Sequence, residues 1–315
     1  MRRGRAPVTG AASGPGWFDP SPLATPPAPL SVAEARRWCE RLARAHYENF
    51  TVLSWLLPRY LRPHVATLYA YCRCADDLAD ETGDPAEALR RLDHWERELE
   101  RCYAGDAEHP VFVALRETIA TFAIPSEPFH DLLVAFRQDQ RVTRYDTYEA
   151  LLGYCRYSAN PVGRLVLLLC GYRDPERQHL SDCVCTALQL TNFWQDVARD
   201  AEKGRIYLPR EDRERFGCTE EQIARRHFTP QFGALIRFEV ERTWALFQQG
   251  ALLEHRLDGW ARVYVGLLAR GGQEVLRAIE RQGCDVLTRR PALSRLRKAM
   301  LAGGGLLGCL VSRRG

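Results

Sequence analysis

Lysine is almost absent from this sequence. Lys203 and Lys298 are the only two lysines among 44 basic side chains, so arginine carries nearly all of the positive charge. Base-composition bias in the host genome explains most of this preference, although the planar guanidinium fork also suits diphosphate oxygens. The net charge is only +4 over 315 residues. A charge this small argues against a nucleic-acid partner.

Long hydrophobic runs are also missing. No stretch reaches the roughly 18 apolar residues that a membrane-spanning helix needs. Residues 1–30 are rich in Pro, Gly, Ser and Ala and lack the apolar segment of a secretory signal. We therefore expect a disordered tail over 1–30 and a single domain over 31–315. The short apolar segment 300–311 is either the last core helix, which we favour, or a peripheral membrane contact.

The cysteines do not form a disulfide pattern. Their number, 11, is odd. Cys72 and Cys74 are two positions apart, as are Cys183 and Cys185, and residues at that spacing do not share a helix face. Neither pair therefore resembles a metal clamp. A reduced, cytoplasmic protein is the simplest interpretation.

Strand-like alternation is scarce and no repeat of 20–50 residues is present, whereas helix boundaries are well marked. Residues typical of helix N-caps or C-caps punctuate the whole chain. The N-cap positions are Ser31, Asp84, Asp174, Thr219 and Thr229, and the C-cap glycines are Gly105, Gly171, Gly204 and Gly283. The pattern predicts an all-α protein with about ten helices.

Three of the expected helices carry the candidate chemistry. The first spans about 63–81, the second about 148–169 with a break at Asn160–Pro161, and the third about 175–201. Asp76 and Asp80 are four residues apart near the end of the first of these helices. That spacing places them on one face, about 6 Å apart along the axis.

The third helix has a similar pattern, with Asn192, Asp196 and Asp200 at intervals of four. Carboxylates crowded beside apolar neighbours either take up protons or bind a cation. Carboxylate and amide oxygens suit Mg²⁺, which usually binds one or two carboxylates together with substrate phosphates. A single Asp-x-x-x-Asp is usually only a solvated helix face, but two such clusters favour a shared magnesium–diphosphate site.

Basic residues flank both clusters. Arg73 lies three residues before Asp76, and Arg199, Lys203 and Arg205 gather at the end of the third helix. These basic residues form either surface ion pairs that add little stability or a cationic rim that binds the diphosphate. We favour the cationic rim. The loop over 202–209 is then positioned to close over the diphosphate.

At these residues the sequence resembles the squalene/phytoene synthase family, over about 38–298. The segments YAYCRCADDLAD and LTNFWQDVARDAEKGRIYLP resemble the two aspartate-rich signatures of the family, and YCRYSANPVG, ARVYVGLL and TRRPALSRLRKAM resemble weaker blocks. The resemblance implies an isoprenoid-synthase fold, in which helices surround a deep central cavity. It also implies a magnesium-dependent prenyl-diphosphate enzyme.

The resemblance further implies roles for individual residues. Tyr154 is expected near the reacting carbons, and the expected catalytic set is Tyr154, Asp76, Asp80 and Asp196. The expected ligands of two or three Mg²⁺ ions with the substrate diphosphate are Asp76, Asp80, Asn192, Asp196 and Asp200. The expected substrate-binding residues are His46, Arg73, Gln189, Arg199, Lys203, Arg205 and Tyr264.

The subtype resembles the C-type squalene synthase of hopanoid pathways, which converts presqualene diphosphate to hydroxysqualene. Gln195 stands where many relatives carry arginine, and this departure argues against simply carrying over the condensation of two farnesyl units. The reaction would ionise the diphosphate and form a carbocation, which a dry cavity protects and aromatic faces stabilise. Candidate aromatic residues are Tyr69, Tyr154, Tyr157, Phe193 and Tyr264, although we favour ordinary core packing for each of them except Tyr154.

NADPH is not expected to be required. Gly303, Gly305 and Gly308 match G-x-G-x-x-G only formally, since no strand precedes them and only seven residues follow. Two alternatives remain: head-to-head condensation of two prenyl diphosphates, and a non-catalytic family member that acts as an assembly factor. The expected partners are a prenyl diphosphate, a presqualene-diphosphate synthase coupled in function, and a membrane surface.

Overall fold

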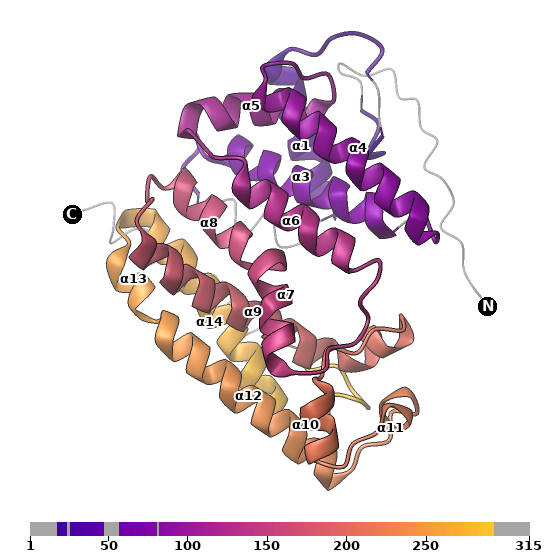
Figure 1. Cartoon of the computed structure of the whole chain (residues 1–315). Helices are drawn as coiled ribbons and strands as arrows, with labels where there is room; N and C mark the ends of the chain where they lie inside the picture. The colour runs from indigo at the N-terminus through magenta and orange to yellow at the C-terminus, as the bar shows by residue number, and fades with distance from the viewer. Residues whose placement is uncertain (1–17, 24–25, 47–56, 81, 293–315) are drawn as a thin grey trace.

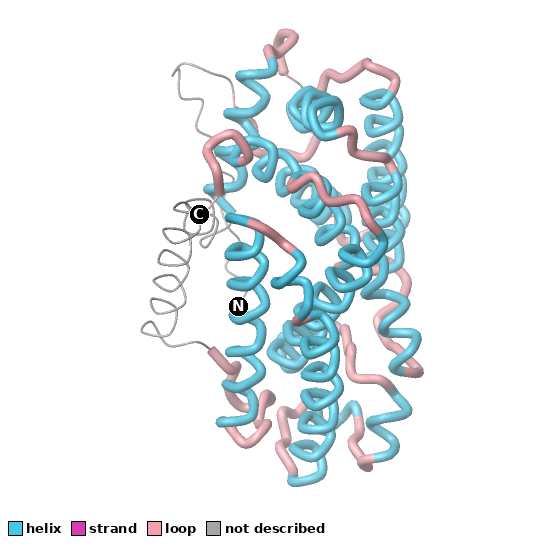
Figure 2. The backbone as a smooth tube through the Cα atoms, turned by 90° about the vertical axis from the view of Figure 1, so that its left-hand side faces the viewer, coloured by secondary structure: helices cyan, strands magenta, loops and turns pink. Residues whose placement is uncertain are grey.

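The computed structural model describes residues 18–23, 26–46, 57–80 and 82–292, and over these residues the protein is all-α. No strand occurs in this part of the chain; the only pairing of that kind is an isolated parallel bridge between Arg144 and Ile206 (Figure 2). The helices are α1 (Val32–His46), α3 (Arg62–Asp80), α4 (Pro85–Tyr103), α5 (Pro110–Phe122), α6 (Glu127–Gln138), α7 (Tyr148–Ser158), α8 (Asn160–Leu169), α9 (Pro175–Glu202), α10 (Arg210–Arg215), α11 (Glu220–Ala224), α12 (Pro230–Gly250), α13 (Leu252–Arg256) and α14 (Gly259–Arg281). Ten of the helices in the described ranges have ten or more residues, which agrees with the predicted number.

The predicted caps define these helices. Asp84, Asp174 and Thr229 each accept a hydrogen bond from a backbone N–H in the first turn of the helix that follows. Thr219 forms a reciprocal capping box with Gln222. The four predicted C-cap glycines all have positive φ values, between 68° and 92°, which residues with a Cβ atom rarely adopt.

The three functional helices match their predicted positions. Helix α3 ends at Asp80, and α9 runs for 28 residues from Pro175 to Glu202. The predicted break in the second helix is confirmed, since α7 ends at Ser158 and α8 begins at Asn160. The buried Asn160 accepts a hydrogen bond from Thr186 of α9 at 3.0 Å, which ties the break to the third functional helix.

Two hydrophobic clusters hold the helices together. The first is formed mainly by α1, α3, α4, α5 and α6 around Trp38, Tyr71 and Trp95, all nearly without exposed area. The second joins α7, α9, α12 and α14 around Trp194 and Phe232. Figure 1 shows the first group of helices above, α12 and α14 below, and α7, α8 and α9 between them. The aspartate-bearing helices α3 and α9 therefore belong to different clusters.

Several predictions concern residues that lie outside the described ranges or only partly within them. The apolar segment 300–311 and Lys298 lie outside, and so does the side chain of His46, the last residue of α1. Within the expected tail, Phe18 packs on Trp38 and the backbone carbonyl of Asp19 accepts a 3.0 Å hydrogen bond from the Trp38 indole. Among the helices of the described residues, none combines the length and apolar character needed to cross a membrane.

Candidate active site

The acidic pair of α3 lies beside an arginine of the same helix that forms an ion pair with Asp76. Asp76 is partly buried, and burial together with the charge of Asp80 raises the pKa of its carboxyl. Arg73 donates to Asp77 from Nε at 3.0 Å and approaches Asp76 from Nη1 at 3.4 Å. The buried Asp77 thus orients the Arg73 guanidinium toward Asp76. Sequence reasoning did not single out Asp77, because it does not share the Asp76–Asp80 face.

The acidic residues of α9 show the same crowding. Burial and the neighbouring charge of Asp196 raise the pKa of Asp200 to about 6, although Lys203, Arg205 and Arg199 oppose this increase. Asn192 is exposed on the same face of the helix. Like charges are therefore held close together on α9, as they are on α3. A cation bound between the carboxylates would reduce the electrostatic repulsion within each pair.

The segment after α9 connects the two acidic helices. Arg205 Nη2 lies 3.3 Å from Asp80 Oδ1 on α3. Backbone contacts hold the segment in place, since the Ile206 N–H donates to Thr143 O at 2.9 Å and Arg144 Nη1 donates to Gly204 O at 2.6 Å. The segment 202–209 is therefore held against the 143–144 backbone and reaches the first motif through Arg205, whereas its closing over a diphosphate stays a prediction.

An aromatic cluster adjoins this arginine. Tyr207, two residues after Arg205, stacks on Phe193 of α9 with ring centroids 3.8 Å apart. Tyr154 and Tyr145 pack beside them, at centroid distances between 5.6 and 6.2 Å. Four aromatic rings thus form one cluster beside the segment that carries Arg205. Tyr154 and Phe193 were candidates for stabilising a carbocation; Tyr145 and Tyr207 were not.

Asp139 is a site residue that sequence reasoning missed. It caps the C-terminus of α6, and its Oδ2 accepts a 3.0 Å hydrogen bond from the Tyr154 hydroxyl. Burial raises the pKa of Asp139 to about 6; Arg205 lowers it, whereas Asp80 and Asp76 raise it further. Its Oδ1 is buried and has no hydrogen-bond partner in the structure. No regular spacing marks this residue, so the sequence carries no signal for it beyond an isolated acidic residue.

The comparison with protein families agrees with this arrangement of residues. The family model described as squalene/phytoene synthase matches residues 43–297, which include both acidic helices and the segment that connects them. The chain belongs to the squalene/phytoene synthase family. Two predictions are thereby confirmed: the family and the all-α isoprenoid-synthase fold.

Individual members of the squalene/phytoene synthase family show the same relationship. The 15-cis-phytoene synthase of a Synechocystis species is 33% identical over 285 residues, which cover 86% of this chain and 83% of the relative. The crystal structure of squalene synthase HpnC from Alicyclobacillus acidocaldarius is 48% identical, with a TM-score of 0.77 over 82% of this chain and 97% of that chain. A dehydrosqualene synthase crystallised with a ligand is 27% identical, with a TM-score of 0.79 over 88% of this chain and 96% of that chain.

Not every predicted residue is connected to the acidic site by a contact in the structure. Tyr264 lies buried on α14 and packs edge-on against Trp260, with centroids 6.2 Å apart. Gln189 is half-buried on α9, two turns before Asp196. The substrate-binding roles of Tyr264, Gln189 and His46 stay predictions, as do those of Arg73, Arg199, Lys203 and Arg205.

The donor atoms of the site suit Mg²⁺ when a diphosphate supplies the remaining ligands. Carboxylate oxygens of Asp76, Asp80, Asp196 and Asp200 and the amide of Asn192 are hard ligands, and burial together with a neighbouring carboxylate raises the pKa values of Asp76 and Asp200. Within the described ranges, no three His, Cys, Asp or Glu side chains are close enough to hold a metal ion alone.

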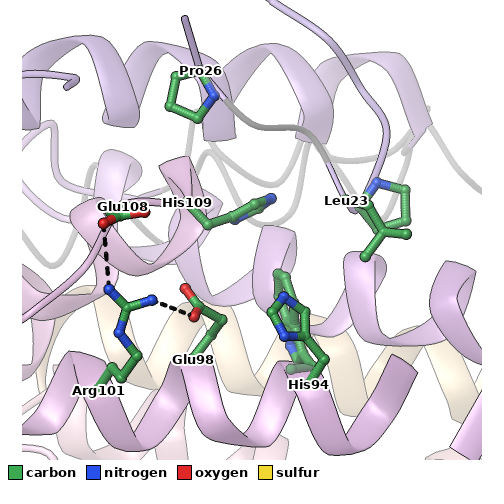
Figure 3. Close-up of a pocket in the computed structure, with 9 residues that line it drawn as sticks. Leu23, Pro26, His94, Glu98, Arg101, Glu108 and His109 are labelled. Carbon is green, nitrogen blue, oxygen red and sulfur yellow. Dashed lines mark hydrogen bonds and ion pairs between the residues drawn. The ribbon is translucent and has the colours of Figure 1, made fainter. Parts of the chain in front are cut away.

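A separate cavity of about 180 Å³ lies beside α4 (Figure 3). It is lined by Pro22, Leu23 and Pro26, by residues of α4 that include His94 and Glu98, and by Glu108 and His109, which directly precede α5. Arg101 bonds to Glu98 at 2.7 Å and to Glu108 at 3.4 Å across its edge. No residue of either aspartate motif lines it, so this cavity is distinct from the candidate active site.

Proposed function

We propose that this protein is an enzyme that ionises a prenyl diphosphate between α3 and α9 with the help of Mg²⁺. The observation that carries the proposal is the 3.3 Å contact between Arg205 and Asp80, which joins the end of one acidic motif to the other beside an aromatic cluster. Acidic ligands, a basic rim and aromatic faces are the three features that the departure of a diphosphate from an allylic carbon needs.

The charged residues would bind and orient the diphosphate. Arg73, Arg205 and Lys203 supply positive charge around the aspartates, and Arg199 lies 3.6 Å from Asp196. Two or three Mg²⁺ ions, when bound, would neutralise the departing diphosphate and hold it in place. Asp76, Asp80, Asn192, Asp196 and Asp200 are the residues that we propose as their ligands.

The aromatic residues would protect the carbocation that remains. The rings of Tyr154, Phe193 and Tyr207 provide electron-rich faces at the same place. Burial raises the pKa values of the Tyr154 and Tyr207 hydroxyls well above the ordinary range, so both groups stay protonated. Neither is therefore available as an anion that would trap the cation prematurely.

We further propose presqualene diphosphate as the substrate and hydroxysqualene as the product. Two features support this choice: the 48% identity to a squalene synthase and the uncharged Gln195 beside the second motif. The last step adds a water molecule to the carbocation, and the water must lose a proton. Asp139 is a suitable acceptor because its Oδ1 is unpartnered and its pKa of about 6 leaves it largely ionised at neutral pH.

Head-to-head condensation of two prenyl diphosphates is the second candidate. The similarity to curated phytoene synthases favours it, since these relatives match 84–87% of the chain. The same aspartates and basic residues would serve both reactions. The choice between the two candidate reactions therefore depends on which substrate the acidic site accepts.

A product assay separates the candidates. Purified protein with Mg²⁺ and no nicotinamide is incubated with presqualene diphosphate in one sample and with farnesyl or geranylgeranyl diphosphate in others, and extracts are analysed by mass spectrometry. Hydroxysqualene from the first sample alone is the expected result. A C30 or C40 product from the other samples would establish condensation instead. If no substrate is consumed in any of the samples, the result would contradict the proposed enzymatic activity.

A further inference from the structure

Both neighbours of Arg205 are fixed to the linker between α6 and α7. The Ile206 N–H donates to Thr143 O at 2.9 Å. The Arg144 guanidinium donates from Nη1 to Gly204 O at 2.6 Å and to Thr143 O at 2.9 Å. Arg205 thus lies between two residues that are bound to the same two linker residues, 143 and 144.

Glu220, in the first turn of α11, orients the Arg144 side chain. Its Oε2 accepts a hydrogen bond from Arg144 Nε at 2.9 Å, and its Oε1 accepts one from Arg213 Nη2 at 3.0 Å. Arg213 is buried, and its Nε donates to Leu208 O at 3.2 Å. One carboxylate therefore joins the two arginines that hold opposite ends of the segment 204–208.

These contacts hold a position more than they stabilise the fold. Arg144 is 38% exposed and Glu220 is 43% exposed, and an ion pair this close to solvent adds little to stability. What the contacts constrain is the backbone on either side of Arg205, whose Nη2 lies 3.3 Å from Asp80 Oδ1. A long side chain that is already held in its binding position loses less conformational entropy when a ligand arrives.

We propose that Arg144 is a positioning residue for the diphosphate site. Oriented by Glu220, it holds the Gly204 carbonyl and so keeps the Arg205 guanidinium directed at the space between α3 and α9. The Arg144 guanidinium bonds to Thr143, Gly204 and Glu220, so its effect on a diphosphate is transmitted through Arg205. This inference rests on the proposed function, in which Arg205 binds the diphosphate.

The affinity for inorganic diphosphate at saturating Mg²⁺, measured by calorimetry, tests the positioning role. Arg144→Gln should bind diphosphate about tenfold more weakly, because the residue before Arg205 is no longer held. Arg144→Lys keeps the charge but cannot bond to Gly204 and Glu220 with one fork, so its affinity should lie between those of Arg144→Gln and the wild type. Glu220→Gln, which keeps the side-chain size and removes the charge, should also weaken binding. Unchanged affinity of Arg144→Gln would overturn the proposal.

A double-mutant cycle shows whether Arg144 acts through Arg205. Arg205→Gln alone should weaken diphosphate binding, and adding Arg144→Gln to it should cause no further loss, because the side chain that Arg144 positions is gone. A residue with a merely structural role, or one that acts by its charge at a distance, would weaken binding equally in both backgrounds. An equal loss in both backgrounds would therefore refute the positioning role.

The matched control is Arg225→Gln. Arg225 lies directly after α11, is 75% exposed and pairs with Glu221 at 2.7 Å. The control removes one arginine charge near the same part of the fold, and its diphosphate affinity should equal that of the wild type. Circular dichroism checks that the helices of each variant are intact. If Arg144→Gln disturbs folding, Arg144→Lys and Glu220→Gln provide the test in both backgrounds.

Failure of this inference can be told apart from failure of the proposed function. If the wild type binds Mg²⁺–diphosphate and Arg205→Gln weakens this binding, but Arg144→Gln behaves like Arg225→Gln, only the positioning role is refuted. If the wild type binds no Mg²⁺–diphosphate, or Arg205→Gln binds it as tightly as the wild type, the proposed role of Arg205 is itself refuted. The positioning role would then fall with it.

Discussion

Arg205 reaches back across the site and places its Nη2 3.3 Å from Asp80 Oδ1, so the end of the second acidic motif is bound to the first. The contact spans 125 positions in the sequence. It is supported by the backbone hydrogen bond from Ile206 to Thr143 and by the stacking of Tyr207 on Phe193. A positive charge is thus fixed between two clusters of aspartates before any substrate arrives.

The acidic residues should be essential for turnover and not for folding. Asp76→Ala and Asp196→Ala should each reduce turnover of the prenyl diphosphate by at least about a hundredfold, because each removes a proposed ligand of the metal–diphosphate. Both side chains are partly exposed, so thermal unfolding should change little. Steady-state release of diphosphate measures the first effect, and calorimetry measures the second.

The control for these variants is Asp106→Ala, at an exposed aspartate that pairs with Arg101 in the loop after α4. Its turnover should equal that of the wild type. Full biological activity of Asp76→Ala and Asp196→Ala in cells would support the non-catalytic alternative, in which the protein acts as an assembly factor.

Asp139 should matter for the end of the reaction rather than for its start. Asp139→Asn keeps the size of the side chain and can still bond to Tyr154, but it cannot accept a proton from water. Formation of hydroxysqualene should fall about a hundredfold, while release of diphosphate falls much less. Mass spectrometry of the product and a coupled diphosphate assay, run on the same samples, separate the two steps. Equal losses in both assays would show that Asp139 acts earlier, in binding or ionisation.

A buried acidic group away from the acidic motifs should make stability depend on pH. Glu239 of α12 has no exposed area, and burial raises the pKa of its carboxyl to about 8. Arg242 donates to it at 2.8 Å and also binds Asp212 of α10, while the Arg242 guanidinium lies 3.8 Å from the Tyr148 ring centroid. Two carboxyls thus share one arginine, and ionisation of both leaves a negative charge uncompensated in the core.

The sign of the effect follows from this raised pKa. The unfolded chain releases the Glu239 proton near pH 4.5, whereas the folded protein keeps it until about pH 8. The stabilising contribution is therefore fully present below pH 4.5 and decreases as the pH rises, until it is lost above about pH 8. Glu239→Gln should reduce this loss, so its free energy of unfolding at pH 9 should exceed that of the wild type in urea titrations. Glu241→Gln, at an exposed position of the same helix, should follow the wild type at every pH.

Two adjacent glycines of α14 should respond in opposite ways to alanine. A Cβ atom at Gly272 would lie 2.5 Å from Leu188 Cδ2 and 2.9 Å from Phe247 Cζ, so Gly272→Ala should destabilise the protein by about 1–3 kcal/mol. A Cβ atom at Gly271 has no neighbouring atom within 4 Å. Gly271→Ala should therefore stabilise the helix by about 0.5–1 kcal/mol. Chemical unfolding of both variants measures the difference, and a similar shift in both would contradict the close approach of α9 and α14.

Features within one helix were predictable from the sequence, because the 3.6-residue period and the capping residues are local properties. The break before Asn160, the caps at Asp84 and Asp174, and the shared face of Asn192, Asp196 and Asp200 all belong to this class. Spacing together with apolar neighbours and the presence of two such clusters identified the acidic motifs, since like charges one turn apart are unfavourable unless a ligand compensates them.

Residues that act through distant partners were not predictable in this way. Asp139 gains its raised pKa from burial and from the charges of Asp80 and Asp76 on α3, and Asp77 was overlooked because its role depends on being buried. The absence of an arginine at position 195 indicated a missing charge, but only the fold shows Arg290 beside it.

The sequence by itself determined the helical class, the family and the two acidic motifs, because each depends on residue types at short spacings. Only the tertiary structure decided which arginine pairs with which aspartate. Arg205 pairs with Asp80, and Arg290 pairs with Asp196. These pairs join residues about a hundred positions apart, and their geometry is set by how α3, α9 and the segment after α14 pack. Local sequence preferences do not specify that packing, since it results from the burial of two hydrophobic clusters shared among many helices.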